Sequence, residues 1–231
     1  MTPDAFYDLG VHAYPEGGST LSLMALKAKE YGYAGICIVN HSNFFLDVGD
    51  VPVPPGVEVV QGVEVVARDA NDLRRQVDRL RKRVRVLAVH GGDAAINRAA
   101  CEEGRVDILM HPQDGKTGGI NHVLARLAAD KGVAIGFELL PVIHSRGGSR
   151  VKTLSSYRSN LALAKKYGAP FVVVSGAMSC YDMRDVRAAL SLCRLFGMGE
   201  RDAIRGLSLY PSEILRRRSP GYIMEGVQVI E

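Results

Sequence analysis

The sequence lacks paired cysteines and long apolar segments, and both absences restrict the class of protein. Without a Cys-x-x-Cys pair, neither a zinc knuckle nor a thiol redox motif is expected, and we expect reduced structural thiols at the four widely spaced cysteines, Cys37, Cys101, Cys180 and Cys193. No apolar run reaches the roughly 18 residues that a membrane span needs. The N-terminus does not combine a basic stretch with an apolar one, as a secretory signal would. We therefore predict a cytoplasmic protein that does not engage a membrane.

Aromatic residues are few, at 6%, and the core must come from the 47% of hydrophobic residues, mainly Val, Leu, Ile and Ala. Carboxylates are scarce in two basic segments. Residues 68–85 carry eight Arg or Lys against three Asp, and residues 144–166 carry six Arg or Lys and no carboxylate. Segregated positive charge favours a polyanionic partner, although basic residues also serve simply to solvate helix faces.

Short apolar, β-branched runs alternate with longer segments of helical period. We predict strands at 5–9, 34–39, 57–66, 84–89, 106–110, 133–138 and 171–175, with a break of the third strand at Gly62 left open. Continuous apolar strands are typical of a parallel sheet that is buried on both faces. Units of about 25–35 residues favour an α/β fold, a TIM-barrel-like (β/α) barrel with about seven parallel strands, over an open doubly wound sheet.

The absence of a Pro/Gly/Ser linker predicts a single barrel domain that spans residues 1–231. Beyond residue 176 the pattern is helical, near 182–196, 200–206 and 211–217, which predicts a helical C-terminal extension. Whether the Val-Gln-Val-Ile stretch in the tail adds an eighth barrel strand stays open.

Several predicted helices have recognisable ends. Ser19 or Thr20 is expected to cap a helix that stops at Gly32. Asn71 is expected to cap a helix whose inward face is Leu73, Val77 and Leu80. A further helix is expected from a cap at Ser155 or Ser156 to a stop at Gly168.

Polar side chains lie at or just past the C-terminal ends of the predicted strands. They are His12, Asn40, His41, Glu64, His90, His111, Glu138 and Ser175. In a barrel these strand ends converge on one rim, where the loops build the active site. The sequence therefore predicts a functional site there, or the remains of one.

The motifs at these strand ends resemble those of a known superfamily. In order, DLGVH, IVNHSN, GVEVV, VHGGD, DILMHP, FELLP and VVVSGAMS resemble the phosphoesterase superfamily that carries polymerase and histidinol phosphatase domains. More closely, YDLGVHAYPEG, VDILMHP and SGAMSCYDMRDVRAALSLCRLFGM resemble the ribonuclease P protein component 3 family, the archaeal counterpart of a eukaryotic nuclear ribonuclease P subunit. This resemblance covers essentially the whole chain.

The chain departs from the metal-dependent members of that superfamily at ligand positions. Gly10 stands where the first motif has a histidine, Asn40 where the second has an aspartate, and the segment from Ser175 to Ser179 lacks the last pair of ligands. A multinuclear site needs enough anionic and imidazole ligands to balance several divalent charges. We expect no working metal site from the positions that remain, which are His12, His41, Glu64, His90, His111 and Glu138. Binding of a single weak ion is left open.

The resemblance implies a protein subunit of ribonuclease P, the ribonucleoprotein endonuclease that removes 5′ leaders from precursor tRNA. In that family the RNA carries the catalytic centre, so this chain is expected to have no catalytic residue, to bind no cofactor and to leave Mg²⁺ to the RNA. The implied partners are the ribonuclease P RNA, precursor tRNA, ribonuclease P protein component 2 and the other protein components. The alternative is a stand-alone metal-dependent phosphoesterase, which would use the rim histidines directly.

Basic residues are the candidates for contact with RNA phosphates. We favour the segment after the strand at 133–138, where Gly147 and Gly148 predict flexible backbone and Tyr157 is expected to stack on an unpaired base. The DGKTGG segment lacks the first glycine of a Walker A motif, so we expect a Gly-rich strand-to-helix turn there. Contact of its Lys116 with a phosphate at the helix N-terminus is left open as the alternative. The predicted RNA-binding residues are Arg146, Arg150, Lys152, Arg158, Arg75, Arg79, Arg83 and Lys116.

Overall fold

Seven parallel strands run round the molecule in chain order, as predicted. The computed structural model describes residues 5–49, 51–113, 119–219, 222–224 and 227–228. The strands are β1 (Tyr7–Val11), β2 (Gly35–Ile38), β3 (Glu58–Val65), β4 (Val86–His90), β5 (Ile108–Met110), β6 (Ala134–Glu138) and β7 (Phe171–Val174). Each lies within two residues of its predicted position, because a continuous apolar run between turn residues is what a strand buried on both faces requires.

The barrel closes where β1 meets the segment that follows β7. The amide of His12 donates to the carbonyl of Ala177 at 2.9 Å, and the amide of Gly176 donates to the carbonyl of Gly10 at 3.0 Å. Closer to the start of β1, the Asp8 carboxylate accepts from the amide of Ser175 at 3.0 Å. Backbone and side chain therefore share the closure of this seam, which removes the exposed sheet edges.

Strand β3 is not broken at Gly62. Its first half, from Glu58 to Gln61, pairs with β2, and its second half, from Gly62 onward, pairs with β4. A Cβ atom at Gly62 would lie 2.4 Å from the Sγ atom of Cys37, so a side chain does not fit there. The glycine permits close approach of neighbouring strands rather than ending the strand.

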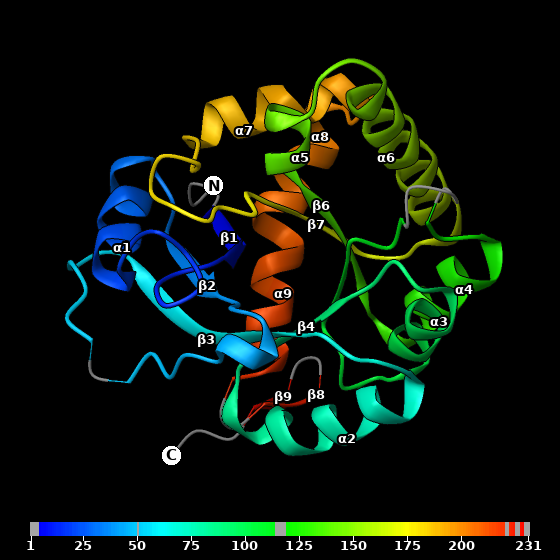
Figure 1. Ribbon diagram of the computed structural model, residues 1–231, viewed down its shortest axis with the longest axis horizontal. Coiled ribbons are helices and arrows are strands. Elements are labelled where there is room, and N and C mark those ends of the chain that lie inside the picture. Colours follow the sequence, from blue (N-terminus) through cyan, green and yellow to red (C-terminus); the bar gives the residue numbers. More distant parts are fainter. Residues whose placement is uncertain (1–4, 50, 114–118, 220–221, 225–226, 229–231) are drawn as a thin grey trace.

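Helices surround the barrel (Figure 1). They are α1 (Leu21–Glu30), α2 (Ala70–Leu80), α3 (Ala94–Glu102), α4 (His122–Lys131), α5 (Leu139–His144), α6 (Gly147–Tyr167), α7 (Val186–Cys193), α8 (Glu200–Ile204) and α9 (Tyr210–Arg217). Short turns of helix are η1 (Ser42–Phe44), η2 (Arg81–Arg83), η3 (Arg194–Phe196) and η4 (Arg205–Leu209). No helix in the described part of the chain is long and apolar enough to cross a membrane.

The N-terminal ends of two helices differ from the prediction. Thr20 caps α1 as expected, but Asp69 rather than Asn71 caps α2, because its carboxylate accepts from the amide of Asp72. The prediction that α6 starts at Ser155 or Ser156 is wrong, since α6 begins at Gly147. Leu154 packs against the core, and this packing offsets the low helix propensity of the two glycines in the first turn. Gly168 ends α6 in the left-handed conformation, as predicted.

Buried apolar side chains form two clusters. The larger lies between the barrel and its helices and includes Leu73, Val77 and Leu80, the predicted inward face of α2. The smaller fills the barrel itself, with members such as Leu9, Cys37 and Val174. All four cysteines are buried and free, as expected.

Helix α9 closes the N-terminal end of the barrel. Its residues Ile214 and Leu215 join the cluster inside the barrel. Arg85, at the start of β4, donates to the carbonyl of Leu215, and Arg217 donates to the carbonyl of Gly132, just before β6. Figure 1 shows α9 crossing the middle of the ring of strands.

The described residues of the tail do not supply an eighth barrel strand. Strand β8 (Tyr222–Met224) pairs only with β9 (Val227–Gln228), in an antiparallel two-stranded sheet apart from the barrel. The predicted helical extension is present as α7, α8 and α9.

Candidate functional site

Four histidines and three glutamates converge on the C-terminal rim of the barrel. Neighbouring rings are close, with centroid separations of 5.2 Å from His12 to His41, 5.1 Å from His41 to His90, and 4.6 Å from His90 to His111. Six members of this rim cluster were predicted, and the seventh is Glu16. We call the following set the rim cluster: His12, Glu16, His41, Glu64, His90, His111 and Glu138.

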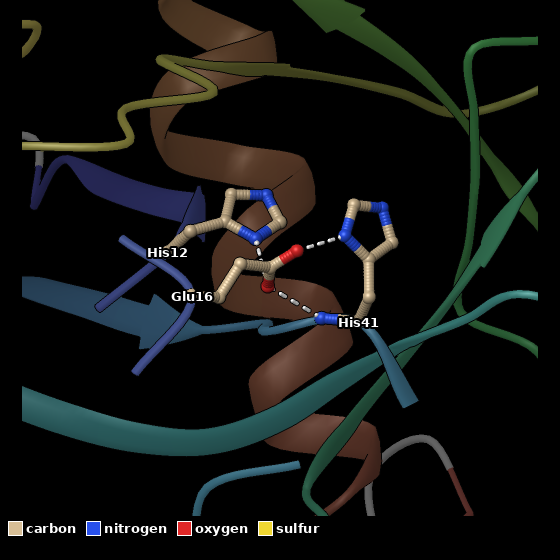
Figure 2. Close-up of side chains that lie close together, drawn as sticks. All are labelled: His12, Glu16 and His41. Carbon is tan, nitrogen blue, oxygen red and sulfur yellow. Dashed lines mark hydrogen bonds and ion pairs between the residues drawn. The ribbon is translucent and has the colours of Figure 1, made fainter. Parts of the chain in front are cut away.

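Glu16 lies between two imidazole rings (Figure 2). Its Oε2 atom is 3.1 Å from Nδ1 of His12 and accepts from the backbone amide of His41 at 2.8 Å, while Oε1 contacts Nδ1 of His41. These hydrogen bonds outweigh the effect of burial and lower the pKa of Glu16 to about 2. The carboxylate therefore stays ionised and fixes both rings.

Sequence reasoning missed Glu16 because it lies in a turn and not at a strand end. The turn is tight: the amide of Gly17 donates to the carbonyl of Ala13 at 3.0 Å. A Cβ atom at Gly17 would lie 2.4 Å from the carbonyl oxygen of His12. The Pro15-Glu16-Gly17 run just after His12 was the available signal, since proline and glycine favour a chain reversal that returns Glu16 to the ring.

Glu64 is the most deeply buried carboxylate of the cluster, with 1% of its side chain exposed. Its Oε1 atom lies 2.6 Å from Nδ1 of His90, 3.7 Å from Nε2 of His41 and 3.8 Å from Nε2 of His111. Burial alone would raise the pKa of Glu64, but the His41 and His90 rings lower it well below its ordinary value. The nearby Glu64 carboxylate in turn raises the pKa of His41 to about 9, assisted by Glu16.

His111 and Glu138 form a second pair, with Nδ1 of His111 at 3.2 Å from Oε2 of Glu138. His111 has a φ of 46°, the one positive φ of a non-glycine residue among the described residues. Burial lowers the pKa of His111 to about 4 and, together with the charge of Glu64, raises that of Glu138 to about 8. Both side chains are therefore largely neutral near pH 7, so their contact is not an ion pair there.

The positions that lack ligands carry structural contacts instead. A Cβ atom at Gly10 would lie 2.6 Å from Cβ of Val174, so a histidine there would collide with β7. Asn40 accepts from the amide of Ala13 and donates to its carbonyl, both at 2.8 Å, which ties two rim loops together. Ser175 accepts from the amide of Ala177 at 3.0 Å. These residues therefore stabilise the barrel seam and the rim loops.

The donor atoms that remain form two candidate groups of metal ligands. Two overlapping groups of described residues bring one ligand atom each to within 4.8 Å of one another: His12, Glu16 and His41, and then His41, Glu64 and His90. Imidazole and carboxylate donors suit zinc or a similar cation, which would supply Lewis-acid chemistry if bound. Gly10 has no side-chain donor, and the side chains of Asn40 and Ser175 are already hydrogen-bonded to the backbone.

The first basic surface, the α6 surface, is defined by Arg146, Arg150, Lys152 and Arg158. It lies after β6, on the same rim as the cluster, but two reasons for favouring it are wrong. Gly147 and Gly148 belong to helix α6 and not to a loop. Tyr157 is 1% exposed and donates from its hydroxyl to the carbonyl of Glu138, so it cannot stack on a base.

Part of the α6 surface borders an apolar hollow. Arg146 and Arg150, together with Arg184, edge a depression of about 470 Å³ whose lining includes Ile143 and Leu192. Arg146 also donates to the carbonyl of Ile143. The two arginines are therefore less free to follow a phosphate backbone than the sequence suggested.

The second basic surface, the α2 surface, is defined by Arg75, Arg79 and Arg83. All three side chains are exposed. Arg75 is paired with Asp72 at 3.2 Å, and the Arg83 guanidinium lies 4.6 Å from the centre of the Phe45 ring. Lys116, the last predicted RNA-binding residue, lies outside the described residues.

Fold and site together define a seven-stranded (β/α) barrel protein whose rim carries a cluster of histidines and carboxylates, with two overlapping groups of potential metal ligands. A family model described as RNase P subunit p30 matches residues 5–220. The chain belongs to that family, which confirms the resemblance and the prediction of a protein subunit of ribonuclease P.

Relatives and solved structures agree with this membership. Ribonuclease P protein component 3 of Methanosarcina mazei is 43% identical over 234 residues, which cover 100% of this chain and 98% of the relative. The protein of the same name from Methanothermobacter thermautotrophicus is 35% identical, covering 97% and 95%. A chain in the cryo-EM structure of archaeal ribonuclease P with mature tRNA superposes with a TM-score of 0.77 at 25% identity, covering 97% of this chain and 98% of that one.

A further solved structure resembles this chain in fold alone. The histidinol phosphate phosphatase of Lactococcus lactis, in a crystal structure with zinc, superposes with a TM-score of 0.55 at 13% identity, over 83% of this chain and 94% of that one.

Proposed function

We propose that this chain assists the catalytic RNA of ribonuclease P in removing 5′ leaders from precursor tRNA and performs no catalytic step itself. It works in the cytoplasm beside the ribonuclease P RNA, precursor tRNA, ribonuclease P protein component 2 and the other protein components. The Mg²⁺ of the reaction serves the RNA and its substrate, and this chain needs no bound cofactor. The similarity to a chain of archaeal ribonuclease P with mature tRNA supports these partners.

One observation carries the non-catalytic role: the positions that would complete a multinuclear metal centre are occupied by packing and hydrogen bonding. Val174 fills the space beside Gly10, and Asn40 is bound on both sides of its amide to Ala13. The carboxylates of Glu16 and Glu64 are already in contact with imidazoles of the cluster. A stand-alone phosphoesterase would need an ion-activated water that this arrangement does not favour.

A variant at the rim tests the non-catalytic role. His90→Ala removes a ring that is 39% exposed and contacts Glu64 at 2.6 Å. Reconstituted ribonuclease P with this variant should cleave precursor tRNA within about twofold of wild type, since catalysis by a positioned side chain typically contributes about 10²–10⁴-fold. Turnover of a simple phosphodiester by the isolated chain, lost in His90→Ala and restored by added zinc or manganese, would instead establish the phosphoesterase.

The basic surfaces supply the contact with RNA. Lys and Arg neutralise phosphates and release counterions, so affinity for the catalytic RNA should fall steeply with salt, by a slope of about −0.7 to −0.9 per phosphate. The α6 surface is our candidate on the rim side, and Lys152 in it is exposed. The α2 surface is the second candidate.

Changing Arg146, Arg150 and Lys152 together to Ala should reduce stimulation of the catalytic RNA and flatten the salt slope. Circular dichroism and binding to component 2 should stay as in wild type. A matched control is the exposed set Arg98, Arg187 and Arg201, which lies outside both surfaces. Full stimulation by the α6 variant would show that this surface does not meet the RNA.

A further inference from the structure

A polar hollow of about 450 Å³ lies on the barrel rim beside the rim cluster. One wall comes from η1, which follows β2 and begins directly after His41. The other comes from the segment after β3 and from α2, as far as Arg79 in its last turn. Its lining includes Ser42, Asn43 and Arg68, together with Asp72, Arg75 and Arg79. It is therefore built where barrel proteins place their ligand sites.

The hollow is strongly cationic. Three guanidinium groups, those of Arg68, Arg75 and Arg79, face a single carboxylate, that of Asp72. The Arg68 and Arg75 side chains are 83% and 65% exposed, whereas that of Asp72 is only 14% exposed. Arg79 has no ion-pair or hydrogen-bond partner within the part of the chain that the structure describes. The charge that reaches solvent is therefore positive.

Asp72 fixes the positions of its neighbours more than it offsets the positive charge of the arginines. Its Oδ1 atom accepts from Arg75 at 3.2 Å, and its Oδ2 atom accepts from the amide of Arg68 at 3.1 Å and from Nε2 of Gln76 at 3.1 Å. Gln76 also donates to the carbonyl of Val66 at 2.8 Å. These bonds fix the floor of the hollow and leave the outer N–H groups of the guanidiniums available to an anion.

An exposed aromatic residue is next in sequence to two residues that line the hollow, Ser42 and Asn43. Phe44 follows Asn43 in η1 and is 44% exposed. The opposite wall is tied to the same turn, because Ser42 Oγ accepts from the amide of Val66 at 3.2 Å. Proteins bind unpaired nucleotides by combining arginines that contact the phosphate backbone of the nucleic acid with an aromatic ring that stacks on a base.

The geometry points to a binding site for a nucleotide of single-stranded RNA, with its phosphate on Arg68, Arg75 and Arg79 and its unpaired base on the ring of Phe44. This inference rests on the proposed function in so far as RNA is the partner. It goes further by naming unpaired RNA as the ligand and by placing the contact beside η1 and α2, away from the α6 surface.

Binding of a short probe to the full chain tests the site. A fluorescent oligouridylate of about eight nucleotides is titrated by anisotropy at about 50 and about 200 mM salt. Joint replacement of Arg68, Arg75 and Arg79 by Ala should weaken binding at least about tenfold and reduce the salt slope by about 1 or more. The exposed set Arg98, Arg187 and Arg201, changed to Ala, removes the same charge elsewhere and should retain most of the affinity.

The aromatic contact has its own pair of variants. Phe44→Ala should lower the affinity for the probe by about 5- to 100-fold, the range expected for loss of one stacked base. Phe44→Trp should retain the wild-type affinity. A hydrophobic but non-stacking replacement, Phe44→Leu, should behave like Ala. Equal binding of Phe44→Leu and wild type would remove the base from the proposal and overturn it.

Three competitors distinguish other occupants. Inorganic phosphate and an RNA duplex of the same length should compete weakly, because neither offers an unpaired base. An octaglutamate peptide that binds as tightly as the RNA, and is lost with the same arginines, would identify an acidic protein segment instead and refute the inference. So would failure of the wild-type chain to bind the probe, or a triple variant that binds like the control.

The failure of this site and the failure of the proposed function give different results. If the wild-type chain stimulates reconstituted ribonuclease P but the variant at Arg68, Arg75 and Arg79 binds the probe normally, only the site is wrong. If the wild-type chain binds the probe through these arginines but does not stimulate the catalytic RNA, the proposed function is wrong and the site stands.

Discussion

Some arginines of this chain stabilise the fold and others are exposed on its surface, although the sequence does not distinguish the two kinds. Asp107 is fully buried at the start of β5, where it accepts from Arg81 at 2.6 Å, from Arg218 at 2.7 Å and from the amide of Leu87 at 2.9 Å. Arg81 also donates to the carbonyls of Val84 and Arg85. At the N-terminal end of the barrel, these arginines therefore stabilise the fold. The sequence does not reveal this, because their partners are far away along the chain.

Asp107→Asn should destabilise the protein by about 3–5 kcal/mol, because it leaves Arg81 and Arg218 without their anionic partner. The free energy of unfolding from urea denaturation measures the effect. Asp78→Asn is the matched control: it breaks an exposed pair with Arg105 and should cost about 0–1 kcal/mol. Equal effects of the two changes would mean that the buried network contributes no more than a surface pair.

The rim cluster should make stability depend on pH in chelator-treated protein. His41 has an ordinary pKa of 6.5 and one of about 9 in the fold, so its contribution is complete below about pH 6.5 and is lost as pH rises towards 9. Glu138 acts in the same direction, since its pKa rises from 4.5 to about 8 and ionisation in the fold is unfavourable. We expect the free energy of unfolding to fall across this range, by at most about 1.4 kcal/mol per pH unit for each proton.

Urea titrations at a series of pH values measure this dependence. His41→Gln cannot be protonated and should flatten the profile between about pH 6.5 and 9. A wild-type profile that is already flat there would show that His41 is not held as an imidazolium by its two glutamates.

At the scale of elements, the sequence predicted the features that a local pattern determines, and it missed those that depend on tertiary contacts. The strands follow from unbroken apolar runs, and the stops of α1 and α6 follow from Gly32 and Gly168. The start of α6 does not, because two glycines predict a loop and only packing of the later turns makes them helical. Glu16 was missed for the same reason, since its contact with His41 spans 25 positions of sequence.

Helix α9 is the element whose role the sequence least reveals. Its Ile214 is 1% exposed and packs within the barrel. Ile214→Ala should cost about 2–5 kcal/mol of unfolding free energy, as expected for a truncated core side chain. The control Leu209→Ala removes an aliphatic side chain that is 44% exposed, in η4 just before α9, and should cost less than about 1 kcal/mol. Similar costs for the two would argue against α9 as a closure of the barrel.

At the scale of the whole molecule, one calorimetric experiment tests two predictions, that the chain is a single domain and that it folds without metal. The two clusters of buried side chains share the same seven strands, and the rim donors have partners within the protein. Calorimetry should therefore give one unfolding transition whose midpoint does not change with EDTA. Two transitions would indicate two folding units, and a midpoint lowered by chelation would indicate a structural ion.

The close contact of Gly10 with Val174 at the barrel seam also makes a histidine ligand hard to introduce at this position. Gly10→His alone should overpack the seam, and Val174→Gly alone should open a cavity in the core, each at about 1–5 kcal/mol. Made together, the two changes should cost less than the sum of the two alone, a coupling that a double-mutant cycle measures. Neither single step improves the protein, so this pair forms an epistatic barrier between the present scaffold and a metalloenzyme, and additive costs would show that no such barrier exists.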